Sequence, residues 1–253
     1  MISIHIEKSD LIFQKSSEFL INWLRLYHNI GQKTLLLLSG GSATKLYPLL
    51  AEFIKTSNLD LNFLAFGQVD ERFGKGLGFR VQGLGEKDIN SYLIGKTGLW
   101  DACKERKIPY YLVSQEGTLE KSADQYNKTI EKLFKEYIYK VAILGIGEDG
   151  HTAGLIPGYG SEWDIDKYAV GYDHRQNGPR GPFCPGGFRF RISLTPKVIS
   201  QLDYGIIVAL GEKKRKAIEQ ALDPINQNNL NKYPAAIIQK IKKVDLFTDI
   251  CPD

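Results

Sequence analysis

Short apolar runs alternate with helical segments along this chain, and that alternation constrains its fold more than any other feature. The runs at 34–38, 141–144 and 204–210 are hydrophobic at nearly every position, which is typical of strands buried on both faces. Helical patterns follow at 43–55 and 212–222. Because strands that alternate with helices form βαβ units, we expect an α/β fold with a mostly parallel, helix-covered sheet.

The remaining elements continue the same pattern. Further strands are predicted at 2–6, 61–69, 110–113, 168–171, 188–195 and 244–247. Further helices are predicted at 10–27, 88–95, 122–137 and 234–240. Segments rich in glycine and proline interrupt the pattern at 74–85 and 178–187. We find no internal repeat and no linker, so we expect one domain over residues 1–253.

Chain length, net charge and the distribution of basic residues indicate which kinds of ligand the protein could bind. At 253 residues the chain can bury about 75% of the surface that its unfolded form exposes, so its core needs no covalent support. The net charge of +4 suits an anionic small molecule. No dense stripe of Lys and Arg with interleaved aromatic residues is present, and the basic run 213–216 is typical of a solvated helix face. We therefore expect no nucleic acid partner.

The cysteines and the apolar runs indicate the compartment. Cys103, Cys184 and Cys251 are scattered and odd in number, which argues against a disulfide framework and against a zinc site. Residues 1–7 alternate like a strand and lack the pattern of a signal peptide. The apolar runs, including 35–38 and 204–210, are all too short to span a bilayer. These features predict a cytoplasmic protein without a membrane partner.

The segment Glu148-Asp149-Gly150-His151 follows the buried strand at 141–144. Ligands of open α/β sheets bind at the carboxyl ends of the strands. A histidine there can act as a general base, and a carboxylate can fix its tautomer, so we expect His151 and Asp149 to be catalytic. The other histidines occupy ordinary strand, helix or irregular contexts: His5, His28 and His174. No histidine or cysteine cluster with metal-ligand spacing is present, so no metal is expected.

Ser39-Gly40-Gly41-Ser42 lies between the strand at 34–38 and the next helix. Glycines let backbone N–H groups approach an anion, and a helix N-terminus favours negative charge, so a phosphate cradle is one interpretation. A plain turn with a serine N-cap is the alternative. The spacing matches neither a P-loop nor a dinucleotide-binding loop.

Charged residues stand near the ends of three further predicted strands. Asp70-Glu71-Arg72 forms either an ion-paired surface corner or a polar site for sugar hydroxyls. Arg189 and Arg191 share one face of a strand, where they could lie in solvent or bind a phosphate. Lys214 lies in the first turn of a helix, where a cation is disfavoured, and this hints weakly at an anion nearby.

Together these segments resemble the family of glucosamine-6-phosphate isomerases and 6-phosphogluconolactonases. The similar segments run in order through nearly the whole chain, at 39–42 with 45–47, 70–72, Asn90, 145–158, 191–195, 211–214, 234–236 and 247–249. The departures are Ala43-Thr44 for Thr-Pro, Gly154 and Ile156 for Ser and Phe, a glycine-rich stretch at 73–87 without Val-Pro, and a longer connection at 173–188. They leave open the walls of the sugar pocket and any loop that closes over it.

The resemblance implies a Rossmann-like sheet and an enzyme that hydrolyses 6-phospho-D-glucono-1,5-lactone to 6-phospho-D-gluconate in the pentose phosphate pathway. It implies that His151 activates water and that Asp70 and Arg72 orient the sugar and the histidine. The phosphate would bind the cradle and two cations: Ser39, Gly40, Gly41, Ser42, Arg191 and Lys214. No cofactor is implied, and the chain is expected to be a monomer or a small homo-oligomer.

Two alternatives remain open. One is a deaminase or isomerase of the same family. Those enzymes carry a glutamate soon after the histidine, whereas 154–158 contains no acid here, so hydrolysis is favoured. The other is a non-catalytic sugar-phosphate sensor on the same fold. Such sensors carry a helix-turn-helix module, for which the sequence before residue 34 leaves no room.

Overall fold

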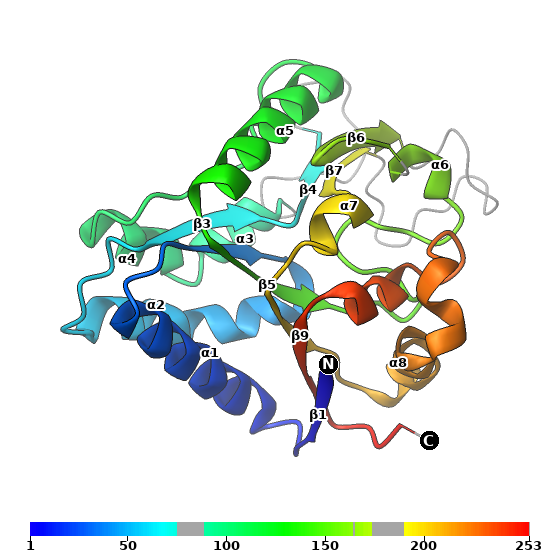
Figure 1. Ribbon diagram of the computed structural model, residues 1–253, viewed down its shortest axis with the longest axis horizontal. Helices are drawn as coiled ribbons and strands as arrows, with labels where there is room; N and C mark the ends of the chain where they lie inside the picture. The colour runs from blue at the N-terminus through cyan, green and yellow to red at the C-terminus, as the bar shows by residue number, and fades with distance from the viewer. Residues whose placement is uncertain (75–88, 164, 174–189, 253) are drawn as a thin grey trace.

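The computed structural model describes residues 1–74, 89–163, 165–173 and 190–252, and at its centre lies a six-stranded sheet (Figure 1). Its strands are β1 (Ile2–Ile6), β2 (Thr34–Leu38), β3 (Leu64–Gln68), β5 (Tyr139–Gly145), β8 (Tyr204–Val208) and β9 (Lys243–Thr248). They lie in the order β1-β9-β8-β5-β2-β3, and every neighbouring pair is parallel. The predicted mostly parallel sheet is therefore confirmed.

Strand β2 shows how the layers form. All five of its residues are buried. Leu35 and Leu37 face one hydrophobic core, while Leu36 and Leu38 face the other, because successive side chains of a strand point to opposite faces. Helices α1 (Ile12–Asn29), α2 (Tyr47–Thr56) and α4 (Leu99–Glu105) pack on the second core, and α5 (Leu119–Glu136) and α8 (Arg215–Leu222) on the first. Figure 1 shows α1 and α2 on the side of the sheet opposite α5.

A second, antiparallel sheet was not predicted. It is formed by β4 (Asp70–Phe73), β7 (Phe190–Leu194) and β6 (Ala169–Asp173), in the order β4-β7-β6. The buried strand predicted over 61–69 is present as β3, but the charged residues 70–72 that follow it belong to β4, because the chain leaves the parallel sheet after Gln68. Val69 joins the two sheets: its N–H donates to Leu38 O, and its carbonyl accepts from the Leu194 N–H.

Several other elements differ from their predicted form in smaller ways. The helix predicted from residue 43 begins as a 3₁₀ turn, Gly41–Leu46, and the one at 234–240 is entirely 3₁₀. The strand predicted at 110–113 is reduced to one bridge, between Tyr110 and Phe66, and the Val113 N–H bonds to the Gln68 side chain instead. The remaining helical segments are α3 (Asn90–Gly95), α6 (Gly160–Trp163), α7 (Pro196–Ile199), and the 3₁₀ turns Glu212–Lys214 and Pro224–Asn228.

Some predictions fall outside the described residues. These are most of the loop at 74–85, the irregular segment at 178–187, and the single residues His174, Cys184 and Arg189. Among the described helices, none is both long enough and apolar enough to cross a membrane.

Candidate functional site

One cleft of about 380 Å³ lies where the carboxyl ends of β2, β5 and β8 face the small antiparallel sheet. Its lining residues are Ser39, Gly40, Gly41, Ser42, Asp70, Arg72, Asn90, Gly145, Ile146, Gly147, His151, Ala153, Arg191 and Lys214. Every predicted site residue lines this cleft except Asp149, which contacts His151 from outside the lining. The structure thus brings the predicted residues together, while their roles stay predictions.

His151 is held by its neighbour Asp149. The Asp149 Oδ1 atom lies 2.5 Å from the His151 Nδ1 atom and also accepts the His151 backbone N–H at 3.1 Å. A Cβ at Gly147 would fall 2.1 Å from His151 Nδ1, so only glycine leaves room for the ring. Because His151 Nδ1 is hydrogen-bonded to the Asp149 carboxylate, Nε2 is the ring nitrogen that can accept a proton from a molecule in the cleft.

The Asp149 carboxylate responds strongly to this contact. Partial burial pushes its pKa upward, but the hydrogen bonds and the charge of His151 outweigh burial and lower the pKa to about 2. Asp149 is therefore ionised throughout the neutral range. An ionised partner at Nδ1 stabilises the imidazolium that forms when Nε2 accepts a proton.

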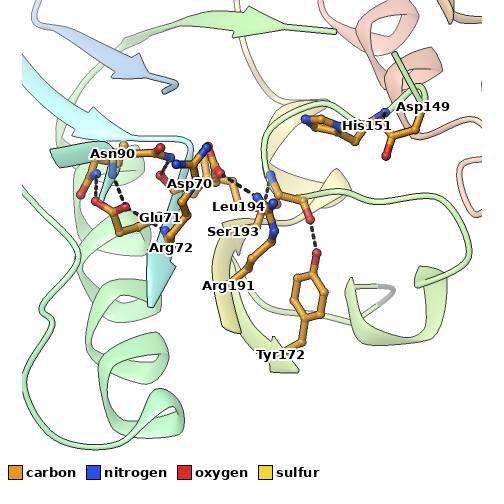
Figure 2. A network of polar contacts seen from close by, with 12 residues as sticks. Asp70, Glu71, Arg72, Asn90, Asp149, His151, Tyr172, Arg191, Ser193 and Leu194 are labelled. Carbon is orange, nitrogen blue, oxygen red and sulfur yellow. Dashed lines mark hydrogen bonds and ion pairs between the residues drawn. The ribbon is translucent and has the colours of Figure 1, made fainter. Parts of the chain in front are cut away.

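The turn after His151 is braced from the small sheet. Ala153 has a φ of +50°, a conformation that non-glycine residues adopt only when their surroundings impose it. The next residue supplies that support: the Gly154 N–H donates to Ser193 Oγ at 3.0 Å, and the Gly154 carbonyl accepts from the Tyr172 hydroxyl (Figure 2). Two strands of the antiparallel sheet therefore hold the turn that follows the histidine.

Other contacts fix the glycine turn before His151. Gly150, with a φ of +84°, accepts the N–H of Ala235 at 3.1 Å, so the segment 234–236 supports the histidine loop. The Thr152 hydroxyl donates to Gly145 O at 2.8 Å and ties the loop to the end of β5. The position of His151 thus depends on contacts from three separate parts of the chain.

The turn at 39–42 opens directly onto the cleft. Gly41 has a φ of +64°, which favours glycine, and the Tyr47 hydroxyl donates to Ser39 O at 2.6 Å. An α-helix does not start here, because residues 41–46 form a 3₁₀ turn. The turn presents small residues and backbone groups to the cleft, as a cradle for an anion requires.

Lys214 reaches the same cleft from the end of β8. Gly211, with a φ of +96°, donates its N–H to Asp249 Oδ1 at 2.9 Å and accepts the Lys214 N–H at 2.8 Å. Burial lowers the pKa of Lys214, and the carboxylates of Glu148 and Asp249 oppose that shift. The predicted solvated face at 213–216 is therefore only partly right: residues 213 and 216 are exposed, but Lys214 is half-buried.

The residues of β4 divide between two faces. Asp70 and Arg72 line the cleft, whereas Glu71 lies between them in a buried network of its own (Figure 2). Asp70 Oδ2 lies 3.7 Å from a guanidinium nitrogen of Arg191 on β7. Burial raises the pKa of Asp70, while the charges of Arg191, Arg72 and His151 oppose the rise. The alternation of a strand explains this split, which the sequence analysis did not resolve.

The cleft wall contains unused hydrogen-bonding capacity. Among the described residues, five buried side-chain atoms have no hydrogen-bond partner, and three of them belong to cleft residues: Ser39 Oγ, Asn90 Oδ1 and Arg191 Nε. Buried polar atoms are nearly always paired in folded proteins, so such a cluster is typical of a site for a polar ligand. Asn90 was missing from the predicted site set, although the resemblance had singled it out.

Metal ligands do not converge in the described part of the chain, where no group of three or more His, Cys, Asp and Glu side chains is arranged to bind an ion. The absence of a metal or organic cofactor stays a prediction. Among the residues that the structure describes, the Lys and Arg side chains that line the cleft are Arg72, Arg191 and Lys214.

The family model described as "Glucosamine-6-phosphate isomerases/6-phosphogluconolactonase" matches residues 7–247. The chain belongs to this family. A 6-phosphogluconolactonase from Xylella fastidiosa is 30% identical over 194 residues, which cover 76% of this chain and 72% of that protein. A glucosamine-6-phosphate deaminase from Staphylococcus haemolyticus is 25% identical over 246 residues, with 90% of each chain covered. Both branches of the family are therefore represented among the relatives.

Solved structures support the fold. The crystal structure of 6-phosphogluconolactonase from Thermotoga maritima superposes with a TM-score of 0.71 at 19% identity, covering 98% of this chain and 99% of that chain. The enzyme of the same name from Plasmodium vivax gives a TM-score of 0.76 at 17% identity, covering 98% and 90%. A monomeric glucosamine-6-phosphate deaminase gives 0.66 at 16% identity, covering 98% and 96%. The predicted Rossmann-like fold class is confirmed.

Proposed function

We propose that this protein is a 6-phosphogluconolactonase, which hydrolyses 6-phospho-D-glucono-1,5-lactone to 6-phospho-D-gluconate in the pentose phosphate pathway. One observation carries the proposal: His151, which is hydrogen-bonded to Asp149, and the turn at 39–42 line the same cleft. The names of the relatives support it, since the 30% identical protein from Xylella fastidiosa is a 6-phosphogluconolactonase. In the proposed site, His151 is the base that activates water, and the turn at 39–42 is the cradle that binds the phosphate.

In the proposed reaction, His151 Nε2 takes a proton from a water molecule as the water oxygen attacks the lactone carbonyl carbon. The tetrahedral intermediate collapses with cleavage of the bond between that carbon and the ring oxygen. The imidazolium returns the proton to the departing ring oxygen, so that the base is regenerated. The ionised Asp149 stabilises the imidazolium and keeps Nδ1 as the protonated nitrogen.

The phosphate end of the substrate is assigned to the backbone N–H groups of residues 40–42, with Arg191 and Lys214 supplying charge. The lowered pKa of Lys214 reflects partial burial, and a bound dianion would favour its charged form. Asp70 and Arg72, on the small antiparallel sheet beside Arg191, are assigned to the sugar and to the orientation of His151. The oxyanion of the intermediate would be stabilised by backbone N–H groups or by a nearby cation.

A deaminase or isomerase is the second candidate, and the similarity to the Staphylococcus haemolyticus deaminase keeps it open. An aldose–ketose isomerase must move a proton between two carbons and needs an additional acid or base. The segment where the deaminases carry a glutamate contains only apolar residues and glycine here, and Leu155 and Ile156 are buried. This composition favours hydrolysis. A non-catalytic sugar-phosphate sensor would bind the same ligands without turnover.

The cellular location and the oligomeric state of the enzyme are also proposals. A cytoplasmic location is supported by the sugar-phosphate substrate and by the buried, unpaired Cys103 thiol, whose pKa burial raises to about 12. A monomer or small homo-oligomer is expected.

The test is direct. Freshly prepared 6-phosphogluconolactone is mixed with the protein, and 6-phosphogluconate is measured through a coupled dehydrogenase against the spontaneous hydrolysis. Turnover well above background supports the proposal. Release of ammonia from glucosamine 6-phosphate would favour the deaminase instead, and tight binding of 6-phosphogluconate without turnover would favour the sensor.

A further inference from the structure

Glu71 is a fully buried carboxylate that does not line the cleft. Its Oε1 atom accepts the backbone N–H groups of Arg72 at 2.8 Å and of Asn90 at 2.6 Å. Its Oε2 atom accepts the Ser91 N–H and the Gln68 Nε2 group, both at 2.7 Å. All four partners are donors, so the ionised carboxylate satisfies every one of them.

Two of these donors belong to cleft residues from different elements. Arg72 lies on β4 and Asn90 at the start of α3, and Glu71 and Asn90 are 19 positions apart in the sequence. A second bond joins the same elements, because Asn90 Nδ2 donates to the Asp70 carbonyl at 3.2 Å. One buried carboxylate therefore sets the spacing between the two elements that form this part of the wall.

The partners of Glu71 are themselves fixed. Gln68 Oε1 accepts the Val113 N–H at 2.8 Å, so the Gln68 amide cannot turn around without breaking that bond. The Gln68 backbone is held in turn by the Tyr126 hydroxyl, which donates to Gln68 O at 2.6 Å. A glutamine at position 71 would place its NH₂ group against two donors, and the network offers no rearrangement that removes the conflict.

From this geometry we infer that Glu71 is a positioning residue, which acts through Arg72 and Asn90 to hold the sugar-binding wall of the cleft. The inference rests on the proposed function, since it assigns that wall to the sugar. It predicts that the charge at position 71 matters for ligand recognition as well as for stability.

The test is a double-mutant cycle of Glu71→Gln and Arg72→Ala, read out as kcat and KM for 6-phosphogluconolactone. Glu71→Gln should raise KM about 10-fold and leave kcat within about 3-fold, because it shifts Arg72 and Asn90 but removes neither side chain and leaves the contact between His151 and Asp149 in place. The double variant should be less impaired than the two single effects combined, because the part of the Glu71 effect that passes through Arg72 is already lost in Arg72→Ala. The inference would be overturned if the effects of Glu71→Gln and Arg72→Ala on KM were fully additive in the double variant, or if Glu71→Gln left KM unchanged.

Asp245→Asn is the matched control. Asp245 is a buried carboxylate that accepts a hydrogen bond from Tyr204 and contacts His5, away from the cleft. Both Glu71→Gln and Asp245→Asn should lose stability in urea unfolding, but Asp245→Asn should keep the wild-type KM. A KM change of the same size in both variants would mean that Glu71 has only a general structural role.

Amide hydrogen exchange in the ligand-free protein separates this inference from the proposed function. In Glu71→Gln, the N–H groups of Arg72, Asn90 and Ser91 should exchange faster, while those of Thr152 and Gly154 should not. If the wild type fails to hydrolyse the lactone, the proposed function is wrong, and the exchange pattern still decides whether Glu71 holds the wall. Unchanged exchange at Arg72 and Asn90 would refute it.

Discussion

The two walls of the cleft are built on different physical principles. The wall on the parallel sheet consists of turns that follow β2, β5 and β8, and its residues are mostly small or partly exposed: Gly41 is exposed, and His151 and Lys214 are half-buried. The wall on the antiparallel sheet consists mostly of strand residues that are almost completely buried, although Arg72 is half-buried. Asp70 and Arg191 are 5% and 7% exposed, and the neighbouring Glu71 is fully buried.

This difference in burial means that substitutions on the two walls should affect folding stability and activity in different proportions. A side chain on a turn has few partners to lose, so its removal should change activity with little effect on folding. A buried charge on a strand is paired, and removal of one partner leaves the other without compensation. Substitutions on the first wall should therefore act mainly on catalysis or binding, while those on the second should change stability and recognition together.

The largest effect is expected for His151→Ala. Loss of the general base should lower kcat by about 10²–10⁴-fold, with the phosphate end of the ligand still bound, while the free energy of unfolding should fall only by the loss of the contact with Asp149. Coupled-assay kinetics and urea unfolding measure the two quantities. His28→Ala, on the helix α1, is the control and should retain full activity. Near-normal turnover in His151→Ala would remove this residue from the mechanism.

Lys214→Ala should come next. Loss of a charge-assisted contact to the phosphate should weaken binding of 6-phosphogluconate by about 10- to 100-fold, measured by calorimetry. The neighbouring Lys213 is exposed and does not line the cleft, so Lys213→Ala is a closely matched control. Equal affinities of Lys214→Ala and the wild type would reject the assigned role.

Gly154→Ala tests the contact between the two walls. An added Cβ would lie 2.6 Å from Ser193 Cβ and 3.5 Å from Asp70 Cβ, so we expect a loss of about 1–3 kcal/mol in the free energy of unfolding. At Gly145, a Cβ would meet only Val208 O at 3.8 Å, so Gly145→Ala serves as the stability control. If both variants unfold at the same urea concentration, the walls are not tightly packed at Gly154.

The smallest effect concerns acid stability. The pKa of Asp149 is lowered from its ordinary 3.8 to about 2 in the folded protein, so its contribution to stability is present above about pH 4. That contribution is lost as the pH falls through about 2. The stability difference between the wild type and Asp149→Asn should shrink over this range in urea unfolding at pH 5 to 2. A difference that stays constant over this range would contradict the lowered pKa.

The local sequence pattern was enough to predict those features that depend on residues close together in the chain. The parallel strands follow from their apolar runs, and the turns at 39–42 and 148–151 follow from glycines directly after those runs. The contact between Asp149 and His151 spans two positions, so the sequence was enough to suggest it. The family resemblance added the order of the motifs and pointed to Asn90 before the fold was known.

What the sequence by itself determined is the α/β pattern and the identity of the residues that end its strands. Only the tertiary structure decided that residues 70–73 leave the parallel sheet and pair with β7, because that pairing joins segments far apart in the chain. It also decided that Glu71 faces the start of α3 while Asp70 and Arg72 face the cleft. Three adjacent charges look alike in a sequence, and only strand alternation and long-range hydrogen bonds separate their roles.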